Sequence, residues 1–415
     1  METTNDLFLA VLKASLVNEP AAVEQEITAQ QWQTLFRMAG IHDVLPMFFE
    51  AVYTSPSLQQ MEPSFLLPLR RQMMQQVMMQ ARRTQEFLAL NRKLQAAGVK
   101  PLVVKGLICR NLYPNPDYRQ SGDEDLLIPE AQFDVCHQVM TDFGLFTSTP
   151  EDQLHSSFEI PYYKQGSPLY IELHKHLFPP ESAAYGDMNR FFEGVFDRAV
   201  AEQTRGGTVY TLDHTDHLFY LICHAFKHFL HSGFGIRQVC DIVLYANAYG
   251  SRIDWMQVLD NCRAINADRF AAALFRIGSK YLVFDPDKAA YPGPWRKISV
   301  DEGPMLDDLL SSGVYGSADL SRQHSSKITL DAVAAQKQGR KAKNKVLGSL
   351  FPPVSQLKGK YPYLRQHPWL LPAAWISRIW TYFLETRTTE DNRAADALKI
   401  GSERIELMRE YGILK

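Results

Sequence analysis

The 415-residue chain has little of what marks a membrane, secreted or nucleic-acid-binding protein. It lacks a run of about 18 uninterrupted apolar residues, so we expect no transmembrane helix. Its first residues show no basic segment followed by a long apolar stretch, so we expect no signal peptide. Its 44 basic and 46 acidic residues leave a formal net charge of −2, which is too small to attract nucleic acid or an anionic membrane. The five cysteines have no C-x-x-C spacing, as is typical of reduced thiols in a cytoplasmic protein.

The apolar pattern divides the chain into a mixed segment between two helical ones. Apolar residues recur at helical spacing up to about residue 97 and again from residue 211, whereas short apolar runs alternate with helical patterns in between. The predicted strands are 99–105, 123–128, 156–163 and 168–175, the last two as a hairpin, and the predicted helices between them are 107–113 and 130–143. This order predicts an α+β fold, in which a small mixed β-sheet core is flanked by N-terminal and C-terminal helical regions. The expected domains are 1–98, 99–210 and 211–415.

Three stretches outside the predicted sheet are unusual in composition. A methionine-rich helix is expected to end at Gly98, with its methionines as flexible packing residues in a core. Residues 336–345 carry five basic residues and no acid, which is typical of a solvated helix and, as the alternative, of a nucleic-acid-binding patch. Residues 367–385 carry three tryptophans but are too short and broken to span a membrane. We expect them to dock onto the helical region, with a peripheral membrane or dimer contact as the alternative.

Negative charge is concentrated where the second strand is predicted to begin. Asp123, Glu124 and Asp125 directly precede the apolar run Leu126–Ile128. Successive side chains of a strand point to opposite faces, so Asp123 and Asp125 would share one face, about 6.5–7 Å apart. Two carboxylates at that spacing can reach a pair of divalent cations about 3.5–4 Å apart, which is the geometry of two-metal phosphoryl transfer.

A third carboxylate is predicted on the strand 168–175. Glu172 is the only acid of this strand and shares one face with Tyr170 and His174, while the apolar residues alternate on the other face. Carboxylates grouped in this way raise one another's pKa unless cations are present, so Mg²⁺ would relieve the repulsion. The hypothesis is therefore a metal site of three carboxylates, and the alternative is a solvated acidic turn ahead of a strand.

The stretch VKGLICRNLYPNPDYRQSGDEDLLI, residues 104–128, resembles the signature of an uncharacterised bacterial nucleotidyltransferase family within the DNA polymerase β-like superfamily. That signature consists of a strand, Lys-Gly, a short helix, Tyr-Pro, a loop carrying an arginine, Asp-x-Asp and an apolar strand, with a later acid-Leu-His element. The matching residues are Lys105, Gly106, Tyr113, Pro114, Arg119, Asp123, Asp125, Glu172, Leu173 and His174. The resemblance extends loosely over the whole chain.

The resemblance implies Mg²⁺-dependent transfer of a nucleoside monophosphate from an NTP to a hydroxyl of a small-molecule or protein acceptor, with release of pyrophosphate. Two Mg²⁺ ions would be held by the implied catalytic residues Asp123, Asp125 and Glu172. The candidate NTP-binding residues are Lys105, Gly106, Arg119 and Lys227. A long nucleic acid fits the near-neutral charge less well, and the sequence names neither the acceptor nor an oligomeric state.

Three positions of the matching stretch carry alternative interpretations. The superfamily usually has Gly-Ser after the first strand, where this chain has Gly106 and Leu107, so phosphate contacts would fall to backbone N–H groups at the helix start, with Lys105. Glu124 stands where a hydrophobic residue is usual and needs a buried partner that the sequence does not name. Arg119 is a triphosphate clamp, a structural tie to the acidic cluster or a surface residue. The missing serine and the unusual Glu124 favour, as the alternative function, a non-catalytic nucleotide-sensing or partner-binding relative.

A histidine stripe is predicted on the first helix after the sheet. Its members, spaced to share one helical face, are His217, His224, His228 and His231. They would line the cleft between domains, with Lys227 near the triphosphate, or pack without a role. Zinc binding by His224 and His228 is a further alternative that lacks a nearby acid at metal spacing. Arg237 and Asp241, on the next helix, are candidates to pair with the stripe.

Overall fold

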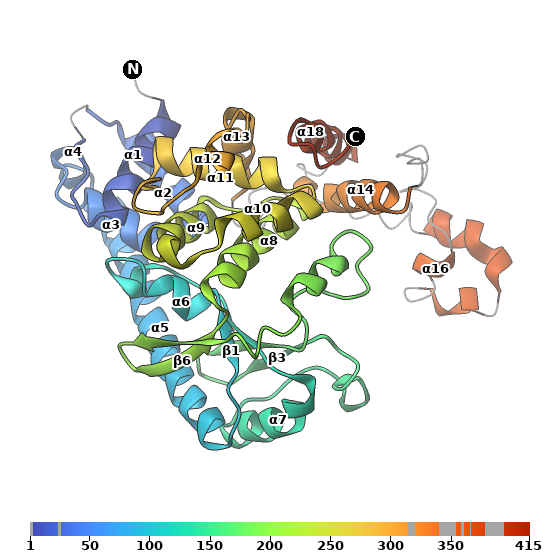
Figure 1. Ribbon diagram of the computed structural model, residues 1–415. Coiled ribbons are helices and arrows are strands. Elements are labelled where there is room, and N and C mark those ends of the chain that lie inside the picture. Colours follow the sequence, from blue (N-terminus) through green and yellow to red (C-terminus); the bar gives the residue numbers. More distant parts are fainter. Residues whose placement is uncertain are drawn as a thin grey trace.

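In a computed structural model, helices enclose a six-stranded mixed β-sheet (Figure 1). The structure describes residues 3–23, 26–313, 320–339, 354–357, 361–365, 367–377 and 394–415. The strands are β1 Leu102–Val104, β2 Glu124–Leu127, β3 Glu159–Tyr163, β4 Tyr170–His174, β5 Val200–Thr204 and β6 Gly207–Thr211. The α-helices up to the sheet and on it are α1 Thr4–Leu16, α2 Ala29–Ile41, α3 Leu45–Val52, α4 Pro56–Gln59, α5 Pro63–Ala96, α6 Gly106–Arg110 and α7 Phe133–Asp142. Those that follow are α8 His214–His231, α9 Ile236–Tyr249, α10 Trp255–Ala264, α11 Asp268–Tyr281, α12 Gly293–Arg296, α13 Gly303–Ser312, α14 Leu320–Lys337, α16 Val354–Leu357 and α18 Ala394–Glu410.

The sheet runs in the order β3-β4-β2-β1-β6-β5, which places β2 and β1 at its centre. β2 pairs antiparallel with β1 and parallel with β4, and β3 pairs antiparallel with β4. The predicted α+β fold, the predicted strands at 99–105, 123–128 and 168–175, and the predicted hairpin are therefore confirmed. The hairpin of β5 and β6 was not predicted, because its strands, VAEQT and GTVYT, are short and largely polar. Among the described helices, none is long and apolar enough to cross a membrane.

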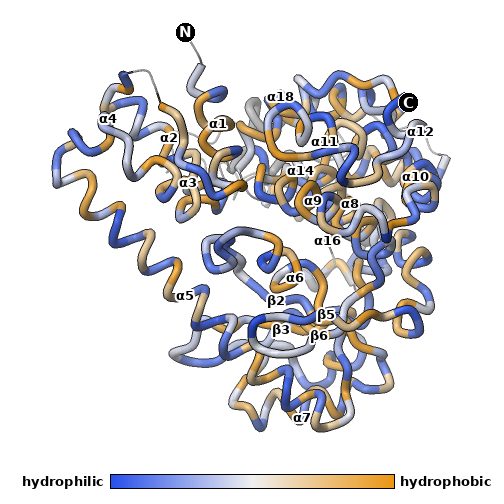
Figure 2. The backbone as a smooth tube through the Cα atoms, turned by 60° about the vertical axis from the view of Figure 1, so that its left-hand side comes forward, coloured by the Kyte–Doolittle hydropathy of each residue, from blue (hydrophilic) through white to orange (hydrophobic). Residues whose placement is uncertain are grey.

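The N-terminal helices reach the sheet through the long helix α5. Thr3 and Thr28, the N-cap residues of α1 and α2, each form a capping box, which satisfies backbone N–H groups at the start of the helix. α5 runs from these helices down along the sheet (Figure 2), where Arg83 Nε donates to the Pro168 carbonyl at 2.9 Å and Gln95 Nε2 to the Thr208 carbonyl at 3.0 Å. The predicted end of the helix is confirmed, because Gly98 takes a φ of 82°.

Met73 of α5 packs against the core as expected, but the other three methionines of this helix do not. Met74, Met78 and Met79 are 50%, 68% and 48% exposed. A helix of 34 residues is about 50 Å long and extends past the elements on which it packs, so part of its apolar surface stays in water. The expectation from composition was therefore wrong for these three residues.

The helices after the sheet share one continuous core with it. Buried apolar residues from Leu7 to Leu414 form a single cluster, and α14 and α18 pack against each other near the C-terminus. A separate, small cluster consists of Leu357, Leu364 and Ala374. Trp375 packs against that cluster, whereas Trp369 is 73% exposed, so the expected docking onto the helical region is wrong for Trp369. Trp380 and residues 340–345 of the basic stretch lie outside the described residues.

Candidate active site

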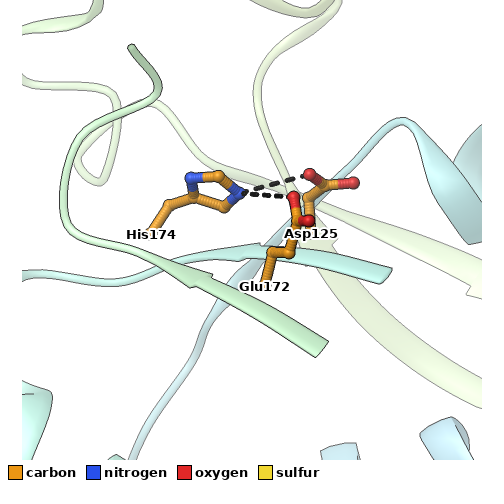
Figure 3. A group of neighbouring side chains, drawn as sticks. All are labelled: Asp125, Glu172 and His174. Atoms are coloured by element: carbon orange, nitrogen blue, oxygen red, sulfur yellow. Dashed lines mark hydrogen bonds and ion pairs between the residues drawn. The ribbon is translucent and has the colours of Figure 1, made fainter. Parts of the chain in front are cut away.

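Three side chains converge on one face at the centre of the sheet. β2 and β4 run parallel, and Asp125 lies directly beside Glu172 in their register. His174 is two residues beyond Glu172, so it points to the same face. Figure 3 shows the three side chains turned toward one another, with His174 Nε2 at 3.2 Å from Asp125 Oδ1 and 3.8 Å from Glu172 Oε2. One ligand atom from each residue lies within 4.8 Å of the others, close enough to hold one metal ion.

Lys105 supplies a cation to these carboxylates. It lies between β1 and α6, and its φ of 52° is unusual for a residue with a side chain. Its backbone N–H donates to His217 Nε2 at 3.3 Å, and Thr211 connects His217 back to a carbonyl of β1. These bonds support the strained turn. The turn places the Lys105 ammonium 2.9 Å from Asp125 Oδ2 and 3.8 Å from Asp123 Oδ2.

Among the carboxylates of this group, Glu172 has the raised pKa. Burial, together with the charges of Asp125 and Asp123, raises the pKa of Glu172 to about 8. Burial acts in the same sense on Asp125, but the Lys105 ammonium and the His174 imidazole outweigh it and hold the pKa of Asp125 below its ordinary value. Burial disfavours charged His174, yet its hydrogen bond to Asp125 raises the His174 pKa overall. The expectation of raised pKa values is confirmed for Glu172 and wrong for Asp125, because two basic groups stabilise the second carboxylate.

Asp123 stands just outside the strand. β2 begins at Glu124, and the Asp123 side chain is 22% exposed, against 3% for Asp125. Asp123 approaches Lys105 but lies beyond the closely spaced group of Figure 3. The structure therefore brings two of the three predicted carboxylates side by side and leaves the third at the edge of the group.

Glu124 is neutralised on the opposite face of β2. Its carboxylate forms a fully buried ion pair with Arg110 of α6, and its Oε2 accepts the Leu107 N–H at 3.1 Å. Arg110 also donates to Ser121 Oγ at 2.6 Å. Gly106 makes the close approach possible, because a Cβ at that position would collide with the Glu124 carboxylate. The missing partner of Glu124 is thus Arg110, and the Leu107 N–H that was expected to contact a phosphate donates to Glu124 instead.

Arg119 is tied to α9 and not to the acidic cluster. Its Nε and Nη2 donate to the two carboxylate oxygens of Asp241 at 3.1 and 2.6 Å, and Tyr113 Oη donates to Asp241 Oδ1 at 2.8 Å. Burial would lower the pKa of Arg119, but the charge of Asp241 holds it well above its ordinary value. Arg119 and Asp241 therefore form a charged, bidentate link between the loop before β2 and the helix above it.

The histidine stripe lies on α8 and faces the acidic group. His224 Nε2 is 3.3 Å from Lys105 Nζ and 3.2 Å from His228 Nε2. Burial and the nearby ammonium groups lower the pKa of His224 and of His228 well below the ordinary value, so both rings are neutral near pH 7. Burial and the Lys105 charge also lower the pKa of Lys227, whose neighbours include Asp125. The prediction that this helix lines the site is confirmed.

Zinc binding by His224 and His228 finds no support in the described part of the chain. The two rings contact each other, but no third ligand from the described residues joins them. Among these residues, the one group of three possible metal ligands is that of Figure 3. His217 supports the turn before α6, and burial lowers its pKa to about 3. His231 Nε2 is hydrogen-bonded to Tyr185 Oη at 2.7 Å. His217 and His231, at the two ends of the stripe, thus have structural contacts, whereas His224 and His228, in its middle, lie on the side of the acids.

A pocket lies where the sheet meets α8 and α9. Four predicted site residues line it, namely Lys105, Gly106, Arg119 and Asp123. The helices contribute Leu221 and His224 from α8, and Arg237 and Gln238 from the first turn of α9. The Lys105 ammonium connects the pocket to Asp125, so the pocket and the acidic group form one site.

Sequence reasoning left three residues out of the site. His174 had a usable signal, because strand alternation already placed it on the face of Glu172. Arg237 was a candidate only to pair with the histidine stripe, and Gln238 had no signal, since their position depends on how α9 packs above the sheet. The local sequence pattern therefore predicts which side chains meet within the sheet, but it does not predict site residues that come from a helix packed on the sheet.

The acidic group fits a divalent cation. Carboxylate oxygens and imidazole nitrogens are common ligands of such ions. Asp125 Oδ2 is buried, and the Lys105 ammonium 2.9 Å away already places one positive charge beside it. A cation beside this atom would also relieve the repulsion that raises the pKa of Glu172.

Comparison with known protein families agrees with this site. The chain matches the model of a family described as "uncharacterised nucleotidyltransferase" over residues 28–282, which is more than half of its length. The chain therefore belongs to that nucleotidyltransferase family, and its general activity is the transfer of a nucleotidyl group. No curated protein and no solved structure matches it.

Proposed function

We propose that the protein has a polymerase β-like core and transfers a nucleoside monophosphate from an NTP to an acceptor hydroxyl, releasing pyrophosphate. The observation that carries this proposal is the pairing of Asp125 with Glu172 in the sheet, inside the matched region of the family. The residues to hold two Mg²⁺ ions are Asp123, Asp125 and Glu172, and bound Mg²⁺ supplies charge neutralisation of the triphosphate.

The chain's own residues bind and orient the reactants. The acceptor oxygen forms a bond to the α-phosphorus, the bond from that phosphorus to the bridging oxygen breaks, and pyrophosphate leaves with that oxygen. Glu172, ionised when bound cations offset the repulsion that raises its pKa to about 8, takes the proton that the hydroxyl loses. Lys105 and Lys227 bind phosphate oxygens with their ammonium groups. Arg119 fixes the loop before the acids, and Gly106 permits the tight turn that aims Lys105.

The acceptor in this proposal is a hydroxyl of a small molecule or of a protein. A net charge of −2 gives no field that would hold a long nucleic acid. Neutral histidines of α8 lie close to the acids, with His224 next to Lys105. This surrounding suits a compact acceptor more than an extended polyanion.

The variants Asp123→Asn and Asp125→Asn test the metal site. Each keeps the shape of the side chain and removes one charge. Mg²⁺ with ATP, GTP, CTP or UTP should raise the melting temperature of the wild-type protein, since a ligand at 100 times its Kd adds about 2.7 kcal/mol. Both variants should lose this shift, measured by differential scanning fluorimetry. A pyrophosphate-release assay with candidate acceptors then tests turnover.

A matched control is Asp152→Asn, on the exposed 3₁₀ helix Glu151–Gln153, which should keep the full shift. A full Mg²⁺-NTP shift in both site variants would refute the metal site. Binding without pyrophosphate release, across all acceptors tried, would favour the alternative of a non-catalytic nucleotide sensor.

A further inference from the structure

The start of α6 has no room for a phosphate. The Leu107 N–H donates to Glu124 Oε2 at 3.1 Å, and Gly106 packs so closely on the Glu124 carboxylate that a Cβ would not fit. An internal carboxylate thus occupies the position at which an anionic ligand would meet this turn. The phosphates of an NTP must therefore find donors on another wall of the pocket.

The opposite wall is the first turn of α9. Arg237 and Gln238 line the same pocket as Lys105 and Asp123, and they are only 4% and 7% exposed. Both are buried, yet Arg237 Nε and Gln238 Nε2 have no hydrogen-bond partner among the described residues. A buried donor without a partner is unfavourable, so two such donors in one pocket indicate a ligand that accepts hydrogen bonds.

The chemistry of this wall suits an anion. The N-terminus of a 14-residue helix carries partial positive charge, and guanidinium and amide N–H groups only donate. Arg119 and Asp241 neutralise each other, and Lys105 pairs with Asp125 and Asp123. Arg237, whose Nη1 lies 3.8 Å from Asp43 Oδ2, brings positive charge to this wall. Among its lining residues the pocket has no phenylalanine, tyrosine or tryptophan on which a base would stack.

We propose that Arg237 and Gln238, at the N-terminus of α9, form the subsite for the β- and γ-phosphates of the NTP and hence for the leaving pyrophosphate. The inference rests on the proposed nucleotidyl transfer and assigns a part of that site which the sheet does not provide. The sheet then holds the metal and the acceptor side, and α9 holds the polyphosphate. Arg237 also donates to the Gln120 carbonyl, which keeps its guanidinium next to the loop before β2.

The variant Gln238→Glu isolates the proposed contact. The Gly235 N–H donates to Gln238 Oε1 at 2.6 Å, and glutamate keeps that acceptor while it replaces the free donor by a carboxylate oxygen. We expect pyrophosphate with Mg²⁺ to bind the full chain at least 10-fold more weakly in isothermal titration calorimetry. Arg237→Lys keeps the charge, removes Nε and should weaken pyrophosphate binding several-fold.

Gln257→Glu is the matched control. Gln257 occupies the same third position in α10, after the N-cap Asp254, but it is exposed and lies outside the lining of the pocket. The affinity of the Gln257→Glu protein for pyrophosphate should equal that of the wild type. The melting temperatures of all three variants show whether the fold is kept. If Gln238→Glu lowers the melting temperature, the pyrophosphate affinity of Arg237→Lys becomes the test of the subsite.

Three results would overturn the subsite, and they differ from one another. Unchanged pyrophosphate affinity in both α9 variants, with NTP turnover still present, would remove the subsite and leave the proposed function intact. Weaker binding of a nucleoside but not of pyrophosphate would assign the donors to the base. If the wild type binds neither pyrophosphate nor NTP in the presence of Mg²⁺, the proposed function itself fails.

Discussion

Glu172→Gln should stabilise the metal-free protein, and the gain should grow with pH. Burial and the charges of Asp125 and Asp123 raise the pKa of Glu172 to about 8. The folded state therefore keeps a proton that the unfolded chain releases above the ordinary pKa of 4.5, and stability falls as pH rises from about 4.5 to about 8. Glutamine resembles the protonated side chain and cannot ionise, so the variant escapes this loss.

The raised pKa of Glu172 sets the size of the effect. The difference between about 8 and 4.5, at about 1.4 kcal/mol for each pKa unit, gives an upper limit of roughly 5 kcal/mol above about pH 8. At about pH 7 the same linkage gives roughly 3 kcal/mol, and at about pH 5 it gives less than about 1 kcal/mol. The side chain is 24% exposed, so solvent screens part of the repulsion. We expect a measured gain of about 2 kcal/mol at about pH 8.

Urea unfolding of the metal-free protein at about pH 5 and pH 8 measures this difference in the free energy of unfolding. Some pH dependence should remain in the variant, because His174 also has a raised pKa, and its contribution is lost as pH rises through that value. Glu151→Gln, at an exposed position, is the control and should change little at either pH. A gain that is equal at both pH values, or a loss at about pH 8, would contradict the electrostatic account of Glu172.

Two further predictions concern the support of the site. Arg110→Met leaves the buried charge of Glu124 without its partner and should lower the free energy of unfolding by about 3–5 kcal/mol in urea. The double variant Arg110→Met with Glu124→Met should recover most of that loss, and no recovery would show that Arg110 acts through packing alone. Gly106→Ala places a Cβ against the Glu124 carboxylate and should cost about 1–3 kcal/mol by the same assay. The cost should shrink in a Glu124→Ala background, whereas an equal cost in both backgrounds would refute the contact.

The sheet and its acids could be predicted because strands have a period of two residues. The alternation in PLYIELHKHL put Glu172 and His174 on one face, and the Asp-x-Asp stretch ahead of an apolar run put Asp125 at the start of a strand. The structure confirms that β2 and β4 are neighbours and sets Asp125 against Glu172. The missed hairpin of β5 and β6 shows the limit of this signal, since a polar, half-exposed edge has no apolar alternation.

Contacts between elements could not be predicted in the same way. Arg110 lies 14 positions before Glu124, and nothing in either local pattern points to the pair; only the turn at Gly106 brings them together. The pairing of Lys105 with Asp125 was not predicted either, because it depends on the unusual φ of the turn before α6. Such contacts depend on the backbone conformation of a single turn, and the spacing of apolar residues does not predict that conformation.

The position of Lys105 has a consequence for ligand binding. Its ammonium lies between Asp123 and Asp125, and it is the basic group that holds the Asp125 carboxylate in its charged form together with His174. A divalent cation that binds the same carboxylates meets this positive charge, so metal alone must overcome repulsion from the ammonium. An NTP that arrives with the metal brings phosphate oxygens to which Lys105 can turn. Binding of the metal and binding of the nucleotide are therefore expected to favour each other, because each provides the opposite charge that the other requires.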